Sequence, residues 1–308
     1  MIQCAACGGP LDERSVLEGF DRLYGTPGEY SVAICPRCGS GRTLPLVSSD
    51  KLGAFYPSQY NAYGLPENPV LRSLATALFE RRYRRALRSG PLGVLAERAP
   101  GRLLDVGSGR GDLGVVLRRS GWQVAGLEPS TEAVAEARKR GVESQRGTLT
   151  EGPRPEGRYD AVVFNHSLEH VVEPFEDLST ARQLLEPGGL VLISLPNFGS
   201  WQARRFGSRW FHLDLPRHRT HFTERGLETL LRRAGFAHIR TTTSTSADGL
   251  PMSIQYQFLG RRRFAAGAAR YLAIAGTLAL VPVTVAANAV AGAGDLLHAV
   301  AEKSRDAD

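Results

Sequence analysis

Four cysteines near the start of the chain are spaced as metal ligands. They form two C-x2-C pairs, Cys4 with Cys7 and Cys35 with Cys38. Four thiolates in a tetrahedral arrangement favour Zn²⁺, and they leave no position open for water. We therefore predict a structural zinc site. A redox pair is disfavoured, because neither C-x2-C begins a helix within a βαβ pattern.

A second set of candidate residues surrounds a glycine-rich turn. In "RLLDVGSGRGDLG" a buried strand ends at Asp105, and the turn after it contains Gly107, Gly109 and Gly111. Glycine lets a ligand approach the backbone closely, and the start of the following helix offers free N–H groups. The next strand, in "WQVAGLEPS", ends at Glu128, whose carboxylate can accept the hydroxyl protons of a ribose. The glycine turn alone does not identify the ligand.

Histidines are the candidates for accepting a proton. His166 and His170 flank "SLE" after the strand "YDAVVFN", and His212, His218 and His221 lie in "WFHLDLPRHRTHFT". Imidazole titrates near neutral pH, so it can take the proton of a nucleophilic hydroxyl. We predict that His170 or His218 is the base, with His166 as a third candidate, although a single histidine is more often positional. A second metal site of histidine and glutamate is an alternative that the spacing supports little.

A parallel sheet is the element that can bring these residues together. From Gly101 onward, short apolar runs alternate with amphipathic stretches, which is typical of an α/β fold. Ligands of such folds bind at the carboxyl ends of the strands, where the acidic residues and histidines are predicted to lie. The last two strands are predicted at residues 236–246 and 295–303.

Four segments resemble the class I S-adenosylmethionine-dependent methyltransferases in order and spacing: "LLDVGSGRG", "GLEPS", "YDAVVFNHSLEHV" and "LLEPGGLVLISLPN". The resemblance covers about residues 100–245. It implies a Rossmann-like sheet of seven strands, the last antiparallel and inserted between the fifth and sixth. It also implies S-adenosylmethionine as cofactor, with Asp105 and the glycines around the methionine portion, Glu128 on the ribose, and Thr148 and Leu149 beside the adenine. The complete implied set is Asp105, Gly107, Ser108, Gly109, Gly111, Glu128, Pro129, Thr148, Leu149 and Asn165.

The cysteine pairs and the aromatic stretch "AFYPSQYNAYG" resemble a subgroup that carries a zinc ribbon ahead of this fold. Several members act on sugars or glycan intermediates. The resemblance divides the chain into a zinc ribbon (1–50), an aromatic and basic helical linker (51–98) and a methyltransferase domain (99–308) with a helical insert at about 247–294.

The expected reaction is O-methylation, with C-methylation as a variant, of a saccharide or lipid-linked glycan intermediate. One alternative is an rRNA or tRNA methyltransferase that uses the zinc ribbon to contact RNA. Against it, the fourth strand ends in "NHSLEH" rather than the Asn/Asp-Pro-Pro-aromatic motif used on base amines. The other alternative is a non-catalytic S-adenosylmethionine-binding module, which the intact acidic residues and glycines disfavour.

An apolar segment near the end of the chain, "RYLAIAGTLALVPVTVAANAVAGAGD", is nearly long enough to cross a membrane. A single crossing is excluded, because the strands on either side must pair in one sheet. Pro282 is expected to break or kink the helix near its middle, which suggests two short helices folded back on each other. Arginines at 261–263 precede the segment, so we favour a hairpin on an anionic membrane surface, with a packed lid as the alternative.

Composition and charge fit a globular protein with anionic partners. The 308 residues are 42% hydrophobic and 22% charged, and the net charge of +7 favours phosphates, acidic lipid headgroups or nucleic acid, of which nucleic acid is the less favoured here. The start of the chain lacks the basic and apolar pattern of a secretory signal, so we expect a cytoplasmic protein, peripheral on the inner membrane face if it binds lipid. The oligomeric state is not indicated.

Overall fold

The structure, a computed structural model, describes residues 2–48, 51, 53–56, 69–89, 92–152, 155–261 and 268–305. Its main sheet has seven strands in the order β10-β11-β8-β7-β4-β5-β6. Strand β11 is antiparallel to both of its neighbours, and the other pairs are parallel. This arrangement confirms the predicted fold class. The strands are β4 (Arg102–Val106), β5 (Gln123–Glu128), β6 (Glu143–Arg146), β7 (Tyr159–Asn165), β8 (Leu185–Pro196), β10 (Phe236–Ser244) and β11 (Leu296–Lys303).

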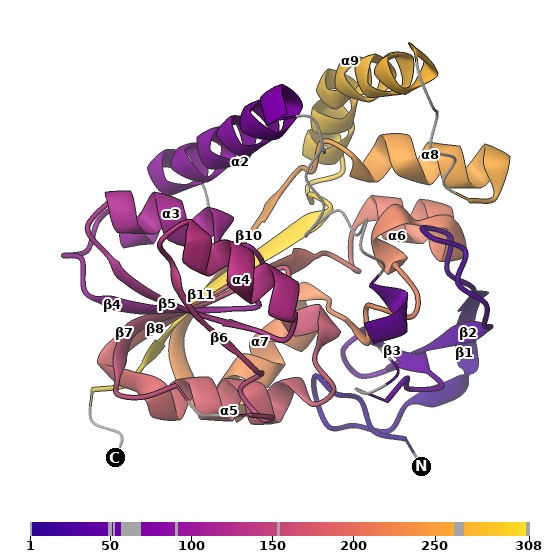
Figure 1. Ribbon diagram of the computed structural model, residues 1–308. Coiled ribbons are helices and arrows are strands. Elements are labelled where there is room, and N and C mark those ends of the chain that lie inside the picture. The colour runs from indigo at the N-terminus through magenta and orange to yellow at the C-terminus, as the bar shows by residue number, and fades with distance from the viewer. Residues whose placement is uncertain are drawn as a thin grey trace.

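Helices cover both faces of this sheet (Figure 1). One face carries α3 (Asp112–Arg119) and α4 (Thr131–Lys139), and α2 (Pro69–Ser89) packs on α3. The opposite face carries α5 (Pro174–Leu184) and α7 (Glu224–Arg233). The chain also forms α6 (Trp201–Phe206), α8 (Gly249–Leu259), α9 (Ala268–Val290) and the 3-10 turns η1 (Gly53–Phe55), η2 (Gly93–Leu95), η3 (Leu168–His170), η4 (Gly207–Arg209) and η5 (Phe211–Leu213).

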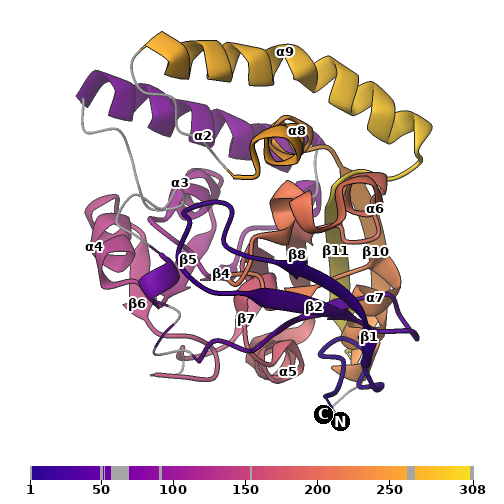
Figure 2. The same ribbon diagram turned by 90° about the vertical axis from the view of Figure 1, so that its right-hand side faces the viewer.

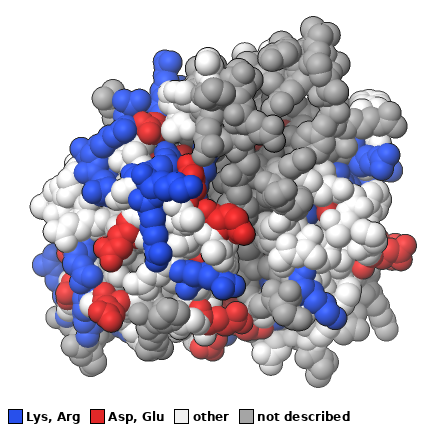
Figure 3. All heavy atoms as spheres, in the orientation of Figure 1, with Lys and Arg blue, Asp and Glu red and all other residues white. Residues whose placement is uncertain are grey.

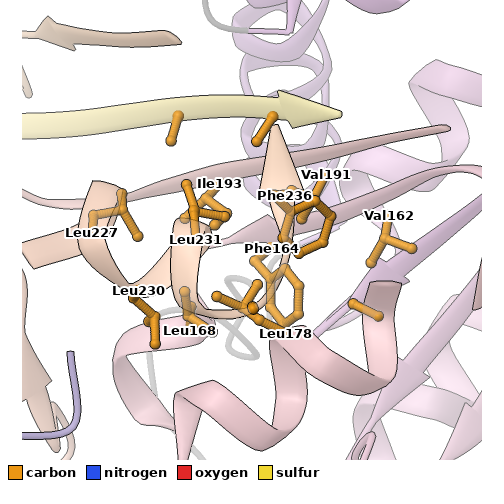
Figure 4. Packing of buried hydrophobic residues seen from close by; sticks show 14 of the residues in the cluster. Val162, Phe164, Leu168, Leu178, Val191, Ile193, Leu227, Leu230, Leu231 and Phe236 are labelled. Atoms are coloured by element: carbon orange, nitrogen blue, oxygen red, sulfur yellow. The ribbon is translucent and has the colours of Figure 1, made fainter. Parts of the chain in front are cut away.

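The core forms because adjacent strand residues point to opposite faces. Val162 and Phe164 of β7 point toward α5 and α7, where Figure 4 shows Phe164 beside Leu178. Val163 of the same strand belongs to the cluster under α3 and α4, on the other face. Burying each such side chain contributes about 1.5–3 kcal/mol. The sheet is therefore a rigid base for the residues at its strand ends.

The N-terminal segment forms a second, four-stranded sheet in the order β1-β2-β3-β9. Its first three strands are β1 (Asp12–Gly19), β2 (Tyr30–Ile34) and β3 (Gly41–Leu44), and the fourth is β9 (Thr220–His221), from the segment after β8. The division of the chain at residue 50 stays a prediction. Because β9 pairs with β3, the N-terminal sheet is joined directly to the loops at the carboxyl edge of the main sheet.

The apolar segment differs from the predicted hairpin. Helix α9 continues through Pro282 and bends along its length (Figure 2), so of the break or kink expected at Pro282 the break is wrong, and so are the two short helices folded back on each other. Proline removes one backbone hydrogen bond, and the helix accommodates this loss by bending instead of ending. None of the described helices has both the length and the apolar character that a membrane crossing requires. Arg262 and Arg263 lie outside the described residues.

Candidate functional site

The glycine turn after β4 has the shape that a closely bound ligand needs. Gly107, Gly109 and Gly111 all have positive φ, at +74°, +53° and +78°. A Cβ on Gly107 would lie 2.5 Å from the Cβ of Ser167, so a side chain there would collide with the next loop. A Cβ on Gly109 would meet no atom of the described residues within 4 Å. As far as these residues go, the backbone at Gly109 therefore faces space that a cofactor can occupy.

Glu128 lies beside this turn at the end of β5. Its Oε2 accepts the N–H of Gly109 at 2.9 Å, and its Oε1 accepts the N–H of Ser130 at 2.9 Å. The two bonds hold the carboxylate at the strand end, and a carboxylate oxygen can accept more than one hydrogen bond. The geometry thus fits a diol such as a ribose, as the sequence predicts for S-adenosylmethionine.

Asp105 is a second buried carboxyl group at the same sheet edge, with 2% of its surface exposed. Burial, followed by repulsion from Glu128, raises the pKa of Asp105 from 3.8 to about 7. An ionised carboxylate at this depth is unfavourable in the absence of a cation. The positive charges of S-adenosylmethionine can supply that compensation.

The raised pKa makes stability depend on pH in a definite direction. Folded Asp105 keeps its proton between pH 3.8 and about 7, where the unfolded chain releases it, so its contribution to stability is lost as pH rises through this window. The effect is on the order of 4 kcal/mol at most, at 1.36 kcal/mol per pKa unit. Urea unfolding at pH 5 and pH 8 without cofactor should show a larger loss for wild type than for Asp105→Asn. Equal losses would contradict a raised pKa.

The remaining residues predicted to contact S-adenosylmethionine lie along the same edge, and the structure gives each a protein partner. The Oγ atoms of Ser108 and Ser144 are 3.4 Å apart, the Pro129 carbonyl accepts from Arg146 Nε, and Thr148 Oγ1 accepts the N–H of Glu151. Leu149 is buried, and Asn165 Nδ2 donates to the Tyr83 hydroxyl of α2. Their roles toward the cofactor stay predictions.

The loop after β7 brings two of the predicted histidines to the glycine turn. Ser167 Oγ donates to the carbonyl of Val106 at 2.6 Å, which fastens the loop to the end of β4. His166, the preceding residue, has a φ of +56°, a left-handed conformation that non-glycine residues rarely adopt. Such a strained conformation persists only where the surrounding structure compensates for its cost, and strained residues are concentrated at functional sites.

His170 and His218 meet beside this loop, together with Glu169. The two imidazole rings are 4.7 Å apart between centroids and stand edge to face. His218 Nε2 lies 4.0 Å from Glu169 Oε1, and His166 Nδ1 lies 3.6 Å from the same oxygen. The three histidines predicted as candidates for the base are thus brought together around one carboxylate.

The protonation states in this cluster follow from burial and from neighbouring charges. Burial raises the pKa of Glu169, but the nearby histidines lower it by a larger amount, so that the resulting pKa is about 2. Burial and the neighbouring His170 lower the pKa of His218 to about 4. At neutral pH the cluster therefore contains an ionised carboxylate and a neutral His218, which accept protons or metal ions rather than donate protons.

The other two histidines of the same segment bind protein groups elsewhere. His212 Nε2 lies 3.2 Å from Asp295 Oδ2, at the start of β11, and His221 Nε2 lies 2.9 Å from Thr43 Oγ1 in β3. Burial, followed by repulsion from His218, lowers the pKa of His221 to about 3, so its ring is neutral at physiological pH. Both residues have structural partners.

Three residues near the site had no predicted role. Glu169 was visible only as the neighbour of His170. Tyr56, whose hydroxyl is 3.0 Å from His170 Nδ1, belongs to the aromatic stretch quoted above. Arg219 is buried with its N–H donating to the Glu169 carbonyl at 2.8 Å. The spacing of Glu169 and His170 before the distant His218 was the only signal that could have revealed this cluster.

The cysteines form a separate cluster that fits a zinc ion. The Cys4 and Cys38 sulfurs are 3.6 Å apart, and those of Cys7 and Cys35 are 3.5 Å apart. All four ligand atoms lie within 4.8 Å of one another, and no cysteine is in a disulfide. Tetrahedral Zn²⁺ with bonds of about 2.3 Å places its sulfurs about 3.8 Å apart, so the four residues fit this ion. It would crosslink the loops before β1 and after β2.

Replacing Cys35 by serine is expected to abolish tight metal binding at the cysteine cluster and to loosen the N-terminal sheet. Cobalt substitution can check this, because thiolate ligands give a sulfur-to-cobalt charge-transfer absorption that histidine and carboxylate ligands do not. The variant should lose most of this absorption while its affinity for S-adenosylmethionine changes little. A wild-type protein without the absorption would contradict a four-thiolate site.

The seven-stranded sheet and the glycine turn between two strand-end carboxyl groups define a class I S-adenosylmethionine-dependent methyltransferase. A family model described as "Methyltransferase domain" matches residues 79–241, and the chain belongs to this family.

Two similar relatives are both named ubiquinone biosynthesis O-methyltransferase. The protein from Cronobacter sakazakii is 37% identical over 117 residues, covering 34% of this chain and 48% of the relative. The protein from Escherichia coli O139:H28 is 32% identical over 139 residues, covering 41% and 58%. The chain thus spans about half the length of the curated relatives that it matches.

A solved structure supports the fold. Phosphoethanolamine N-methyltransferase 2 of Haemonchus contortus, in complex with S-adenosyl-L-methionine, superimposes with a TM-score of 0.51 at 18% identity. The match covers 86% of this chain and 62% of the other. At this identity, the likeness concerns the fold alone.

Proposed function

We propose that this protein transfers the methyl group of S-adenosylmethionine to a hydroxyl oxygen of a saccharide-type acceptor. The observation that carries the proposal is the cluster of Glu169 and three histidines beside the glycine turn. A new O–C bond forms as the sulfonium S–C bond breaks, and the hydroxyl proton must pass to a base such as a neutral imidazole. The names of the relatives agree with an oxygen acceptor.

Arg219 supports an acceptor that carries a negative charge. It is 2% exposed, and its Nε and Nη2 are buried without a hydrogen-bond partner among the residues that the structure describes. A buried guanidinium group is costly unless an anion pairs with it, and phosphate or carboxylate oxygens match its geometry. A lipid-linked glycan intermediate or a nucleotide sugar has such phosphates. We therefore favour these acceptors over neutral sugars.

Helices α2, α8 and α9, at the top of Figures 1 and 2, support an acceptor at a membrane surface. Helix α9 is anchored through Asn288, which accepts from Trp201 Nε1 and donates to Asp295 Oδ1. Its C-terminal half is therefore packed on the body, as a lid would be. Apolar side chains nevertheless remain exposed on these helices, and exposed Arg81 and Arg84 lie on α2. The exposed apolar residues are Val70, Leu78, Phe258, Leu259, Val283, Val285 and Val290.

The surface charges offer less support for nucleic acid. In Figure 3, acidic and basic side chains are interspersed over the face that carries α3 and α4. Arg140 pairs with Asp112 at 2.6 Å, and Arg119 pairs with Glu80. Charges neutralised in this way do not form the continuous basic surface that phosphate backbones require. We therefore keep RNA as an outcome of the test below.

The test supplies methyl-labelled S-adenosylmethionine with three acceptor pools: phosphate-bearing lipid-linked saccharides, nucleotide sugars and total RNA. We expect the label in a methyl ether of one of the first two pools. Arg219→Gln should raise the KM for that acceptor about tenfold or more without changing cofactor affinity, because one charge-assisted contact is lost. Arg225→Gln, an exposed arginine of α7, is the control. Label in RNA alone, or cofactor binding without any methylated product, would overturn the proposal.

Vesicles test the membrane part separately. The full chain should sediment with phosphatidylglycerol vesicles at low salt and be released at high salt, since each basic residue near an anionic surface contributes about 1 kcal/mol. Phosphatidylcholine vesicles are the control. If the protein sediments with neither kind of vesicle, α8 and α9 are only a cover packed on the rest of the protein, and the membrane part of the proposal is wrong.

A further inference from the structure

Glu169, His170 and His218 bring possible metal-ligand atoms close together. One ligand atom from each residue lies within 4.8 Å of the others. We propose that these three residues bind a divalent transition-metal ion that holds the acceptor hydroxyl. The role of the ion rests on the proposed function, whereas its binding does not.

The carboxylate of Glu169 is the first observation. It is 2% exposed, and in the part of the chain that the structure describes neither of its oxygens has a hydrogen-bond partner. The nearest histidine nitrogens, at 3.6 and 4.0 Å, are beyond hydrogen-bond distance. The histidines act on this carboxylate only across these longer distances, so its hydrogen-bonding capacity is unused, which is rare for a buried polar group. A metal cation among these residues would bind those oxygens.

The tautomers of the two histidines are the second observation. His170 Nδ1 lies 3.1 Å from the carbonyl oxygen of Arg217, and His218 Nδ1 lies 2.8 Å from that of His212. A carbonyl oxygen only accepts, so His218 Nδ1 carries the ring proton and His218 Nε2 keeps its lone pair. His170 Nδ1 also lies 3.0 Å from the Tyr56 hydroxyl, and an N–H there can donate to the Arg217 carbonyl in the same way. Metal-binding histidines are usually oriented in this way, with the second nitrogen donating to a backbone carbonyl.

The ligand set indicates the class of metal and what it would do. Two imidazoles and one carboxylate suit Zn²⁺, Fe²⁺ or Mn²⁺ and leave coordination positions open. Ligands at about 2.1 Å from an ion lie about 3–3.5 Å apart, so the 4.0 Å between His218 Nε2 and Glu169 Oε1 requires only a small rotation. An ion here lowers the pKa of a hydroxyl that it binds. His166, outside the set and 3.6 Å from Glu169, can then accept the proton.

The test measures Mn²⁺ and Zn²⁺ binding to the full chain without cofactor or acceptor, so its outcome does not depend on methylation. The protein is first loaded with Zn²⁺ at the cysteines, whose soft thiolates do not favour Mn²⁺. Electron paramagnetic resonance should then show one Mn²⁺ bound per chain, or metal analysis a second Zn²⁺. Glu169→Gln and His218→Ala should each weaken this binding at least about tenfold. His238→Ala, which removes an exposed histidine of β10, should bind as wild type does.

Circular dichroism shows whether each variant is folded, and Glu169→Gln preserves the shape of the side chain if His218→Ala does not fold. Wild type that binds neither Mn²⁺ nor a second Zn²⁺ would overturn the proposal. Folded variants with wild-type affinity would also overturn it. If the metal binds but no acceptor is methylated, the site stands and the proposed function fails.

Discussion

Replacing Arg217 by alanine is expected to lower the free energy of unfolding by about 3–5 kcal/mol, the usual result of removing one partner from a buried ion pair. Arg217 is fully buried between Asp21 and Asp214, with Nη2 2.7 Å and 2.6 Å from their oxygens. Its Nη1 also donates to the carbonyl of Phe55. The substitution would leave two carboxylates uncompensated where the N-terminal sheet meets the loops of the site.

Chemical unfolding at neutral pH measures this loss. Arg225→Ala, an exposed arginine on α7, should change the free energy by less than about 0.5 kcal/mol. Adding Asp21→Asn to Arg217→Ala should recover part of the loss, because one of the uncompensated charges disappears. A loss below about 1 kcal/mol for Arg217→Ala would mean that water or another cation replaces the guanidinium group.

Local sequence patterns were sufficient to predict the sheet and its ligand edge. Apolar runs that end in Asp105, Glu128 and Asn165 become β4, β5 and β7, because buried parallel strands need apolar residues on both faces. The glycine turn was equally predictable, since positive φ at Gly107 and Gly111 is a local requirement. The order of the strands, however, came from the family resemblance.

The composition of the histidine cluster could not be predicted, because it depends on contacts between distant segments. His170 and His218 are 48 residues apart in sequence, and only the fold of the segment after β8 places their rings together. The role of Arg217 depends equally on Asp21, 196 residues away. The error at Pro282 has the opposite origin: the local cost of a proline suggested two short helices folded back on each other, whereas α9 continues as one bent helix.

Removing the Glu128 side chain is expected to weaken S-adenosylmethionine binding about tenfold or more. A charge-assisted hydrogen bond contributes about 1.5–3 kcal/mol, and tenfold in affinity corresponds to about 1.4 kcal/mol. Glu128→Ala also removes the acceptor for the N–H of Gly109, so the glycine turn would lose part of its support. Glu128→Gln keeps one acceptor oxygen without the charge, and its affinity should fall between those of wild type and Glu128→Ala.

Titration calorimetry on the three proteins measures these affinities, and Glu132→Ala is the matched control. Glu132 lies one turn further along the chain, exposed at the start of α4, and should leave binding unchanged. Loss of the Glu128 charge also removes the repulsion that helps to raise the pKa of Asp105, so the pKa of Asp105 should fall in both Glu128 variants. Equal affinities for wild type and Glu128→Ala would exclude this carboxylate from the cofactor site and would require that another group binds the ribose.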